Sequence, residues 1–252
     1  MYSIYGVCQD EYDLDTYMVI TSTSAPQPKF RIAFFMWCLK DEKGETVVVD
    51  TGYGEAGSVR LHIKGPDYLK SKMGEISVDP AKVEKVIVTH MHNDHWSAWR
   101  MFSNATFFVQ KRELDFWAGP IKDFEPVARN GPKLEDIQSL LQAKRIKVID
   151  GDKQILPGIE VKRVGGHTPG EQVVIVATKK GTCVLCGDAV DSYMNLEENS
   201  IGVRWTADLV ESYMALKTVK SLTCKPELIV PGHDPLILKR FPSGKENIAQ
   251  IA

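Results

Sequence analysis

The chain has 252 residues, a formal net charge of −2, 43% hydrophobic residues and 25% charged residues. These values are ordinary for a soluble globular protein, and a chain of this length often forms one domain, so we expect residues 1–252 to be a single domain. A charge so near zero gives no field that would attract nucleic acid. No apolar stretch reaches transmembrane length, and residues 1–15 lack a signal-peptide pattern. We therefore expect a cytoplasmic protein that binds neither nucleic acid nor a membrane.

The first clear elements of the chain form a hairpin. Residues 30–39 read as a nearly continuous apolar strand, and residues 45–49 return as a second strand after a polar turn. Asp50 ends this second strand, and a glycine-rich loop runs from there through Gly57. Two interpretations of Asp50 remain open: it supports metal-binding histidines from behind, or it only forms the turn.

A partly helical segment, residues 58–73, comes next, and Asp79-Pro80 then predicts a short helix start over residues 79–83, with Asp as cap and Pro at the first position. The stretch that follows is dense in metal-capable side chains. Val86 to Val88 predict a buried strand, because β-branched residues suit a pleat that is covered on both faces. Four candidate ligands then occur within six residues: His90, His92, Asp94 and His95.

Residues two apart on an extended backbone point to the same side, so the imidazoles of His90 and His92 should lie together. Three nitrogens and a carboxylate exceed what one tetrahedral ion needs from a single segment, and they indicate two neighbouring ions. The plainer alternative is a polar surface turn that holds three of the six histidines.

The rest of the chain alternates between strands and helices. Strands are predicted over residues 106–110, 146–149, 158–164, 172–177, 182–185 and 226–230, and helices over residues 111–117, 134–143 and 206–222. This order favours one α/β domain with two sheets and helices on the outside.

Five cysteines, an odd number, are scattered along the chain and do not form a disulfide framework. Cys183 and Cys186 spell C-x-x-C, but they lie in a predicted strand, where residues three apart point to opposite faces. We therefore expect two buried thiols instead of a redox or zinc pair.

Three more candidate ligands stand where predicted strands end. His167 follows the strand that ends at Val164, Asp188 follows the strand to Leu185, and His233 follows the strand to Val230. Glycines beside them allow sharp turns and close approach, and loops at one edge of a rigid sheet commonly build ligand sites. His62 is the exception among the histidines and is expected to be solvated.

Four motifs in order resemble the metallo-β-lactamase superfamily: H-x-H-x-D-H at residues 90–95, G-H-T-P-G at 166–170, G-D-A at 187–189 and G-H-D at 232–234. Within it the chain is most similar to the N-acyl homoserine lactonase group, through residues 37–39, 47–52, 109–113 and 195–197. The resemblance runs from the first hairpin to His233. It implies an αββα sandwich of two mixed β-sheets with helices on the outer faces and the site at one edge.

The resemblance also implies two ligand sets. They are His90, His92 and His167 for one ion, Asp94, His95 and His233 for the other, and Asp188 as the bridge. Two such cations lower the pKa of a shared water, and the hydroxide so formed would attack a lactone carbonyl. Asp94 would orient this nucleophile and carry a proton to the leaving group. Ligation by nitrogen and oxygen alone favours two Zn²⁺ ions and leaves Mn²⁺, Fe²⁺ and Co²⁺ open.

The chain departs from the lactonase group at three positions. That group has a tyrosine three residues after the bridging Asp, where this chain has Asp191 and the nearest tyrosine is Tyr193. Either Tyr193 reaches the substrate as a catalytic residue, or Asp191 changes what is bound, or Tyr193 only packs. Trp96 stands where small glycines are usual, and Glu171 where many relatives carry another histidine. The expected substrate pocket contains Trp37, Trp96, Phe102, Glu171 and Asp191.

These features predict an enzyme that opens a small lactone, such as an N-acyl homoserine lactone or a related cyclic ester. The same machinery acting on an amide, thioester or other ester is the alternative. A redox diiron protein or a metal carrier fits less well, because redox relatives generally have a carboxylate at the position of His92. A homodimer stays open, because apolar residues near the N-terminus (Tyr2, Ile4 and Tyr5) would be covered by a second copy.

Overall fold

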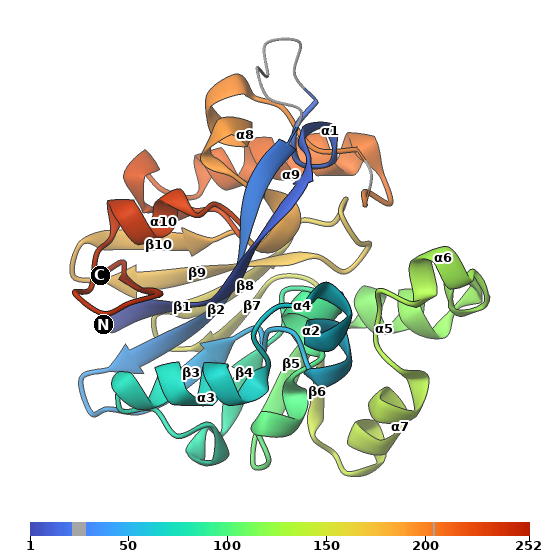
Figure 1. The fold of residues 1–252 in the computed structure, drawn as a ribbon, viewed down its shortest axis with the longest axis horizontal. Helices are drawn as coiled ribbons and strands as arrows, with labels where there is room; N and C mark the ends of the chain where they lie inside the picture. The colour runs from blue at the N-terminus through green and yellow to red at the C-terminus, as the bar shows by residue number, and fades with distance from the viewer. Residues whose placement is uncertain (22–28, 204) are drawn as a thin grey trace.

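Two β-sheets pack face to face in the computed structural model of the protein, which describes residues 1–21, 29–203 and 205–252 (Figure 1). In these residues the first sheet has seven strands in the order β12-β1-β2-β3-β4-β5-β6, and the second has five in the order β11-β10-β9-β8-β7. Each sheet contains both parallel and antiparallel pairs. The predicted fold class, two mixed sheets with outer helices, is confirmed.

The strands of the first sheet are β1 (Tyr2–Asp15), β2 (Lys29–Asp41), β3 (Thr46–Val49), β4 (Lys85–Ile87), β5 (Thr106–Gln110), β6 (Ile146–Ile149) and β12 (Ile248–Gln250). Those of the second are β7 (Lys153–Leu156), β8 (Ile159–Arg163), β9 (Gln172–Thr178), β10 (Gly181–Leu185) and β11 (Ile229–Val230). The helices are α1 (Thr16–Val19), α2 (Glu55–Leu61), α3 (Pro66–Glu75), α4 (Asn93–Trp96), α5 (Lys111–Ala118), α6 (Glu125–Ala128), α7 (Leu134–Gln142), α8 (Tyr193–Glu198), α9 (Leu209–Ser221) and α10 (Leu236–Arg240).

The period of two along β2 explains the layers. Phe35, Trp37 and Leu39 point into the core between the two sheets, whereas Met36 and Cys38 point to the outer core of the first sheet. Helices α3, α5 and α7 contribute buried residues to this outer core. A strand that is apolar on both faces is buried on both sides, which is why residues 30–39 carry an almost unbroken apolar run.

Helix α9 covers the outer face of the second sheet. Its residues Ala215, Leu216 and Val219 pack with Cys186, whereas Cys183 faces the core between the sheets. The thiol of Cys183 in β10 and that of Cys186, just after this strand, are therefore buried on opposite faces of the second sheet, as the spacing predicts, and burial raises the pKa of Cys183 to about 12. The helix predicted over residues 206–222 is present as Leu209–Ser221. Leu209 and Tyr213 are exposed, since the helix turns its first residues toward solvent.

Strand β1 is an element that the sequence patterns did not predict. It lies between β2 and β12 and brings the two ends of the chain side by side (Figure 1). Ile4 is fully buried between the sheets, and Tyr2 and Tyr5 are packed against core clusters of the same chain. Of the apolar residues that suggested a homodimer, Ile4 is thus covered by its own chain, and Tyr2 and Tyr5 are partly covered by it. That residues 1–252 form one domain stays a prediction, which the core shared by both sheets favours.

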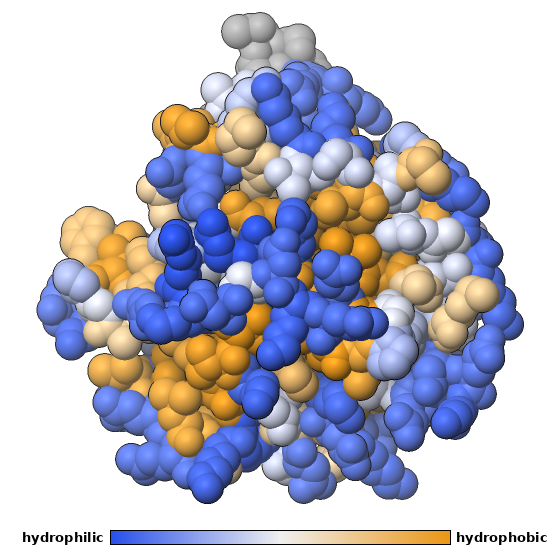
Figure 2. Space-filling model, turned by 180° about the vertical axis from the view of Figure 1, so that it is seen from behind, coloured by the Kyte–Doolittle hydropathy of each residue, from blue (hydrophilic) through white to orange (hydrophobic). Residues whose placement is uncertain are grey.

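The topology gathers the ends of several strands at one edge. Strands β3, β4 and β5 are parallel neighbours, and β10 and β11 are a parallel pair in the other sheet. Parallel strands end on the same side, so the loops after β3, β4, β10 and β11 meet there. Within the described residues no helix has the length and apolarity needed to cross a bilayer. Hydrophilic and hydrophobic areas are interspersed on the face in Figure 2.

Substitution of Phe107 tests the outer core of the first sheet. This side chain of β5 is fully buried, with its ring centroid 5.2 Å from that of Trp96. We expect Phe107→Ala to lower the free energy of unfolding by about 3–5 kcal/mol, because it leaves a cavity. Urea unfolding followed by circular dichroism measures this loss. Phe124→Ala, at a residue that is 55% exposed, is the control and should change it by less than about 0.5 kcal/mol. Equal losses in both variants would contradict the assignment of this core.

Candidate metal centre

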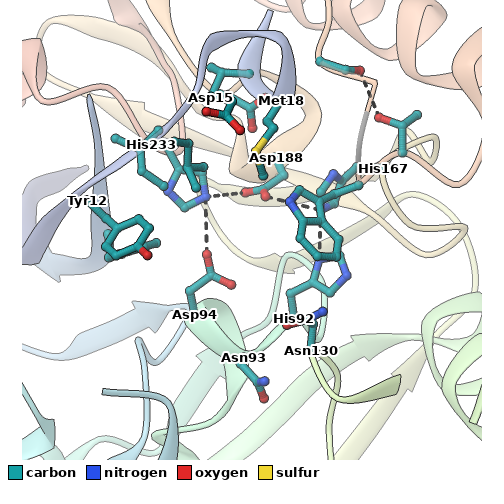
Figure 3. A pocket seen from close by; sticks show the side chains of 18 of the residues that line it. Tyr12, Asp15, Met18, His92, Asn93, Asp94, Asn130, His167, Asp188 and His233 are labelled. Atoms are coloured by element: carbon teal, nitrogen blue, oxygen red, sulfur yellow. Dashed lines mark hydrogen bonds and ion pairs between the residues drawn. The ribbon is translucent and has the colours of Figure 1, made fainter. Parts of the chain in front are cut away.

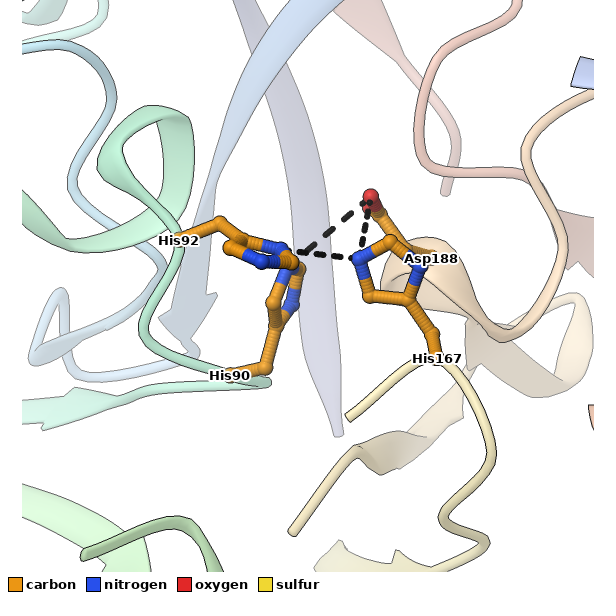
Figure 4. Close-up of side chains that lie close together, drawn as sticks. All are labelled: His90, His92, His167 and Asp188. Carbon is orange, nitrogen blue, oxygen red and sulfur yellow. Dashed lines mark hydrogen bonds and ion pairs between the residues drawn. The ribbon is translucent and has the colours of Figure 1, made fainter. Parts of the chain in front are cut away.

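All seven predicted ligands meet at the edge where the strand ends gather. The ligand atoms of His90, His92, His167 and Asp188 lie within 4.8 Å of one another (Figure 4), and so do those of Asp94, His95 and His233. These are the two groups that the sequence implies, although their coordination of ions stays a prediction. Their loops follow β4, β8, β10 and β11.

Three neutral imidazoles dominate the first group. Nδ1 of His92 lies 3.0 Å from Nε2 of His90 and 2.9 Å from Nε2 of His167, and Oδ2 of Asp188 lies 3.3 Å from that last nitrogen. Burial lowers the pKa of His92 to about 3 and lowers the pKa values of His90 and His167 as well. Neutral imidazoles offer lone pairs, so this convergent set fits a divalent cation of the zinc type.

The second group shares its carboxylate with the first. Oδ1 of Asp188 lies 2.9 Å from Nε2 of His233 and 3.0 Å from Nε2 of His95, whereas its Oδ2 faces the first group (Figure 3). Asp94 Oδ2 lies 3.6 Å from Nε2 of His233. The two oxygens of Asp188 are thus divided between the two groups, which is the arrangement that a bridging ligand requires.

The histidines of the two ligand groups differ in the direction of their pKa shifts. Burial disfavours a charged imidazole at His233, but the carboxylates of Asp188 and Asp94 outweigh burial and raise its pKa to about 9. The pKa of His95 is also raised well above its usual value, against burial, by Asp188 and Asp94. Burial likewise opposes the charge of Asp188, yet the cationic His233 and His95 hold its pKa well below the usual range. In this protein the second group is therefore the one that attracts positive charge most strongly.

Asp50 holds His95 from behind. Its Oδ2 lies 2.8 Å from Nδ1 of His95, and its Oδ1 accepts a 2.8 Å hydrogen bond from the backbone N–H of Thr89. The backbone of Asp50 is left-handed, with φ of 61°, a conformation that costs free energy in a residue other than glycine and that often marks functional sites. Of the two interpretations of Asp50, the geometry favours the support of a ligand.

Glu171 lies behind His90 and does not line the cavity, so its expected place in the pocket is wrong. Its side chain is fully buried, with Oε2 3.0 Å from Nδ1 of His90, and its Oε1 accepts a hydrogen bond from the backbone N–H of Asp188. The backbone of Glu171 bonds to Val164, which turns the side chain inward. Gly187 makes the contact feasible, because a Cβ there would lie 2.5 Å from Oε1 of Glu171.

A third buried carboxylate, Glu113 on α5, connects the ligand loops. It accepts hydrogen bonds from the backbone N–H of Met91 at 2.8 Å and from Oγ1 of Thr168 at 2.6 Å. Trp117 Nε1 donates to it as well, at 2.7 Å. Met91 stands between His90 and His92, and Thr168 follows His167, so one side chain fixes both loops. The sequence analysis gave Glu113 no role, because an acidic residue near a helix start is usually exposed.

A cavity of about 540 Å³ opens above the two groups (Figure 3). Ligands on its floor are His92, Asp94, His167, Asp188 and His233, and apolar residues on its walls are Leu14, Met18, Val19, Ile32, Phe34, Leu61, Val190, Ile201 and Trp205. A cavity of this size and mixed lining suits a small molecule with an apolar part.

Three aromatic residues expected in this pocket lie elsewhere. Trp37 points between the sheets and stacks on Phe35, with ring centroids 5.3 Å apart. Phe102 is fully buried in the outer core of the first sheet, and Trp96 packs there against Phe107 and borders a different cavity. Their placement in the substrate pocket is therefore wrong, because their apolar surface is used for packing.

The position of Tyr193 settles one of the alternatives left open. Its ring packs in the core between the sheets, with the Arg240 guanidinium 3.6 Å from its centroid, and its buried hydroxyl has no hydrogen-bond partner in the described part of the chain. Tyr193 does not line the cavity, so the prediction that it is a catalytic residue is wrong. Asp191 does line the cavity. Helix α8 begins at Tyr193, which turns this side chain away from Asp191.

Tyr53 is a cavity residue that the sequence analysis missed. Its ring meets Phe34 edge-on with centroids 4.9 Å apart, and the Gln9 side-chain amide binds both its backbone N–H and its backbone C=O. Burial and the charge of Asp94 raise the pKa of the phenol well above its usual value. The hydroxyl therefore keeps its proton and remains a donor. Its position in a glycine-rich loop gave no signal of this.

Comparisons with known proteins agree with this geometry. The family model of the metallo-β-lactamase superfamily matches residues 33–233. An N-acyl homoserine lactonase of a Bacillus species is 25% identical over 231 residues, which cover 85% of this chain and 86% of that protein.

Two solved structures resemble the chain in fold. One is an N-acyl homoserine lactone hydrolase with the product N-hexanoyl-L-homoserine bound at its catalytic metal centre. It has a TM-score of 0.75 and 22% identity, and the match covers 94% of this chain and 95% of that one. The other is AidC, a dizinc quorum-quenching lactonase, with a TM-score of 0.74, 19% identity and coverage of 92% and 87%.

Glu113→Gln tests the carboxylate that connects the ligand loops. The amide would turn an N–H toward donors that now face an oxygen, so we expect the free energy of unfolding to fall by about 1–3 kcal/mol. Metal affinity should also fall, by about 10-fold to 100-fold, because the loops lose their fixed positions. Urea unfolding and a chelator competition measure the two effects. Glu135→Gln, at an exposed position of α7, is the control. An unchanged metal affinity in the Glu113 variant would refute this role.

Proposed function

This chain belongs to the metallo-β-lactamase superfamily, and on that premise we propose that it is a lactone hydrolase that depends on two divalent metal ions. The observation that carries the proposal is the division of the Asp188 oxygens between two groups of buried ligands. Relatives named N-acyl homoserine lactonases support the choice of a lactone.

The residues that would hold the ions are the two groups described above, with Asp188 between them. Zn²⁺ is the ion we propose for the first position, since its donors are three neutral imidazoles and one carboxylate. When bound, two such ions would polarise the substrate carbonyl and acidify the water that attacks it.

The ligand Asp94 and the neighbouring Tyr53 would handle the substrate. Asp94 lies on the cavity floor within 3.6 Å of His95 and His233, where its carboxylate would carry a proton to the leaving oxygen of the opened ring. The phenol of Tyr53 would donate a hydrogen bond to the substrate carbonyl, which is worth about 1 kcal/mol.

The apolar wall sets the expected shape of the substrate. Met18, Val19, Ile32, Phe34 and Ile201 line one cavity with the ligands, so a ring would lie on the floor and an apolar tail along this wall. An N-acyl homoserine lactone has this form, with a polar ring at one end and a hydrocarbon chain at the other.

A substrate panel tests the function directly. Purified protein supplied with Zn²⁺ or Mn²⁺ should hydrolyse N-acyl homoserine lactones and simple γ-lactones, and it should act more slowly on matched acyclic amides and thioesters. Rates are measured from acid release at constant pH. An enzyme active on amides and inactive on every lactone would refute the proposal in favour of amide hydrolysis.

Asp188→Ala should remove both ions at once, because one carboxylate serves both groups. We expect the metal content to fall below one ion per chain and the turnover of a lactone to fall by more than about 100-fold. Elemental analysis and steady-state kinetics check these outcomes. The exposed Asp123→Ala is the matched control. Retention of both metal and turnover in the first variant would show that the ligand sets are assigned wrongly.

Tyr53→Phe removes only the phenolic hydroxyl from the cavity. We expect kcat/KM for a lactone to fall by about 5-fold, the equivalent of one hydrogen bond of about 1 kcal/mol, with metal content unchanged. Tyr213→Phe, on exposed α9, should leave kcat/KM unchanged. Should the two variants behave alike, Tyr53 would be a wall residue without a hydrogen bond to the substrate.

A further inference from the structure

We propose that Asp191 is an additional ligand at the second ion position, and that it makes this position selective for a harder cation than Zn²⁺, such as Mn²⁺ or Fe²⁺. The inference rests on the proposed function, since it assumes that the two groups hold ions. It adds a ligand that neither the motifs nor the two ligand sets contain.

The position of Asp191 beside the second group carries the inference. Ligand atoms of Asp188, Asp191 and His233 all lie within 4.8 Å of one another. The backbone fixes this arrangement, because the N–H of His233 donates to the carbonyl of Asp191 at 2.9 Å and the N–H of Gly232 donates to Val190 at 2.9 Å. Two adjacent hydrogen bonds hold the segment after β10 against the segment after β11. Asp191 is therefore as firmly placed as the histidine beside it.

The carboxylate of Asp191 has no other evident task in the described part of the chain. It lines the cavity beside His233 and Asp188, and no donor of a described residue forms a hydrogen bond to it. Asp13 and Asp15, which line the same cavity, are instead paired with Arg31 and Lys29. A carboxylate that faces ligands and lacks a partner is stabilised by a cation.

With Asp191 the donor sets of the two positions differ in kind. The first has three imidazole nitrogens and one carboxylate oxygen. The second has Asp94, His95 and His233, and Asp191, which lies with Asp188 around the same His233, adds a further carboxylate to it. Imidazole-rich sets suit zinc, whereas carboxylate-rich sets suit manganese, and two histidines with carboxylates also suit ferrous iron. A tyrosine at position 191 would supply a neutral phenol and would not add the negative charge of a carboxylate.

Competition between metals tests the inference without any assay of activity. Ion-free wild type and the variants Asp191→Asn and Asp191→Glu are dialysed against Zn²⁺ with Mn²⁺ in large excess, because a given site binds zinc more tightly than manganese. The bound metals are counted by elemental analysis. Asp15→Asn, another cavity carboxylate, is the matched control. Circular dichroism confirms that each variant is folded.

We expect the wild type to bind about one Zn²⁺ and one Mn²⁺ per chain. Asp191→Asn should lose manganese affinity by about 10-fold or more and take zinc at both positions. Asp191→Glu, which keeps a carboxylate, should retain part of the manganese, and Asp15→Asn should match the wild type.

Two outcomes would separate the possible errors. Manganese binding within twofold of wild type in Asp191→Asn, or a wild type that binds two Zn²⁺ ions from the mixture, would overturn the role of Asp191 and leave the proposed function intact. A wild type that binds fewer than two ions of either kind would instead refute the paired centre itself. If Asp191→Asn fails to fold, Asp191→Glu takes its place in the test. An Asp191→Glu variant that binds zinc at both positions and no manganese would then overturn the inference.

Discussion

Seven metal-capable side chains share a small, largely buried space, and the structure holds them there through carboxylates that do not themselves line the cavity. Asp50 lies 2.8 Å from the ring of His95, and Glu171 lies 3.0 Å from the ring of His90. Asp50 is hydrogen-bonded to the outer nitrogen of His95 and leaves the inner nitrogen directed at the centre, and Glu171 places a buried carboxylate beside the outer nitrogen of His90. Glu113 then ties the two loops that carry His92 and His167. The orientation of the ligands depends on this buried layer.

Holding these imidazoles and carboxylates close together in a buried space costs free energy unless cations bind between them. Imidazole nitrogens of His90, His92 and His167 face one another at about 3 Å, and burial keeps them uncharged. Asp188 and Asp94, by contrast, raise the pKa values of His95 and His233 against the effect of burial. Asp50 adds a left-handed backbone. Strain of this kind persists only where the surrounding structure holds the strained residues in place. Here both sheets and α5 hold them.

Sequence patterns could predict the fold and the candidate ligands, and they offered Asp50 as a support behind them, but they could not predict the roles of Glu113 and Glu171. Strand exits and histidine spacing are local features, so the chain alone is enough to place His90, His92, His167, Asp188 and His233 on one edge. Glu113 could not be recognised, because its partners Met91 and Thr168 are 22 and 55 residues away. Trp37 was misplaced because both faces of β2 are apolar, and the side facing the ligands cannot be told from that pattern. Strand β1 mixes charged and aromatic residues, so its burial depends on neighbours β2 and β12.

The divided carboxylate of Asp188 has a consequence for the order in which the centre fills. Asp188 presents Oδ1 to His95 and His233 and Oδ2 to the first group, and a cation held by the first group would hold it in this orientation. The entropy of orienting that side chain is then lost only once, and the second cation meets a prepared site. Binding should accordingly be cooperative, so that chains with a single ion are rare at any metal concentration. A cell that starves this protein of metal would then hold a mixture of full and empty molecules.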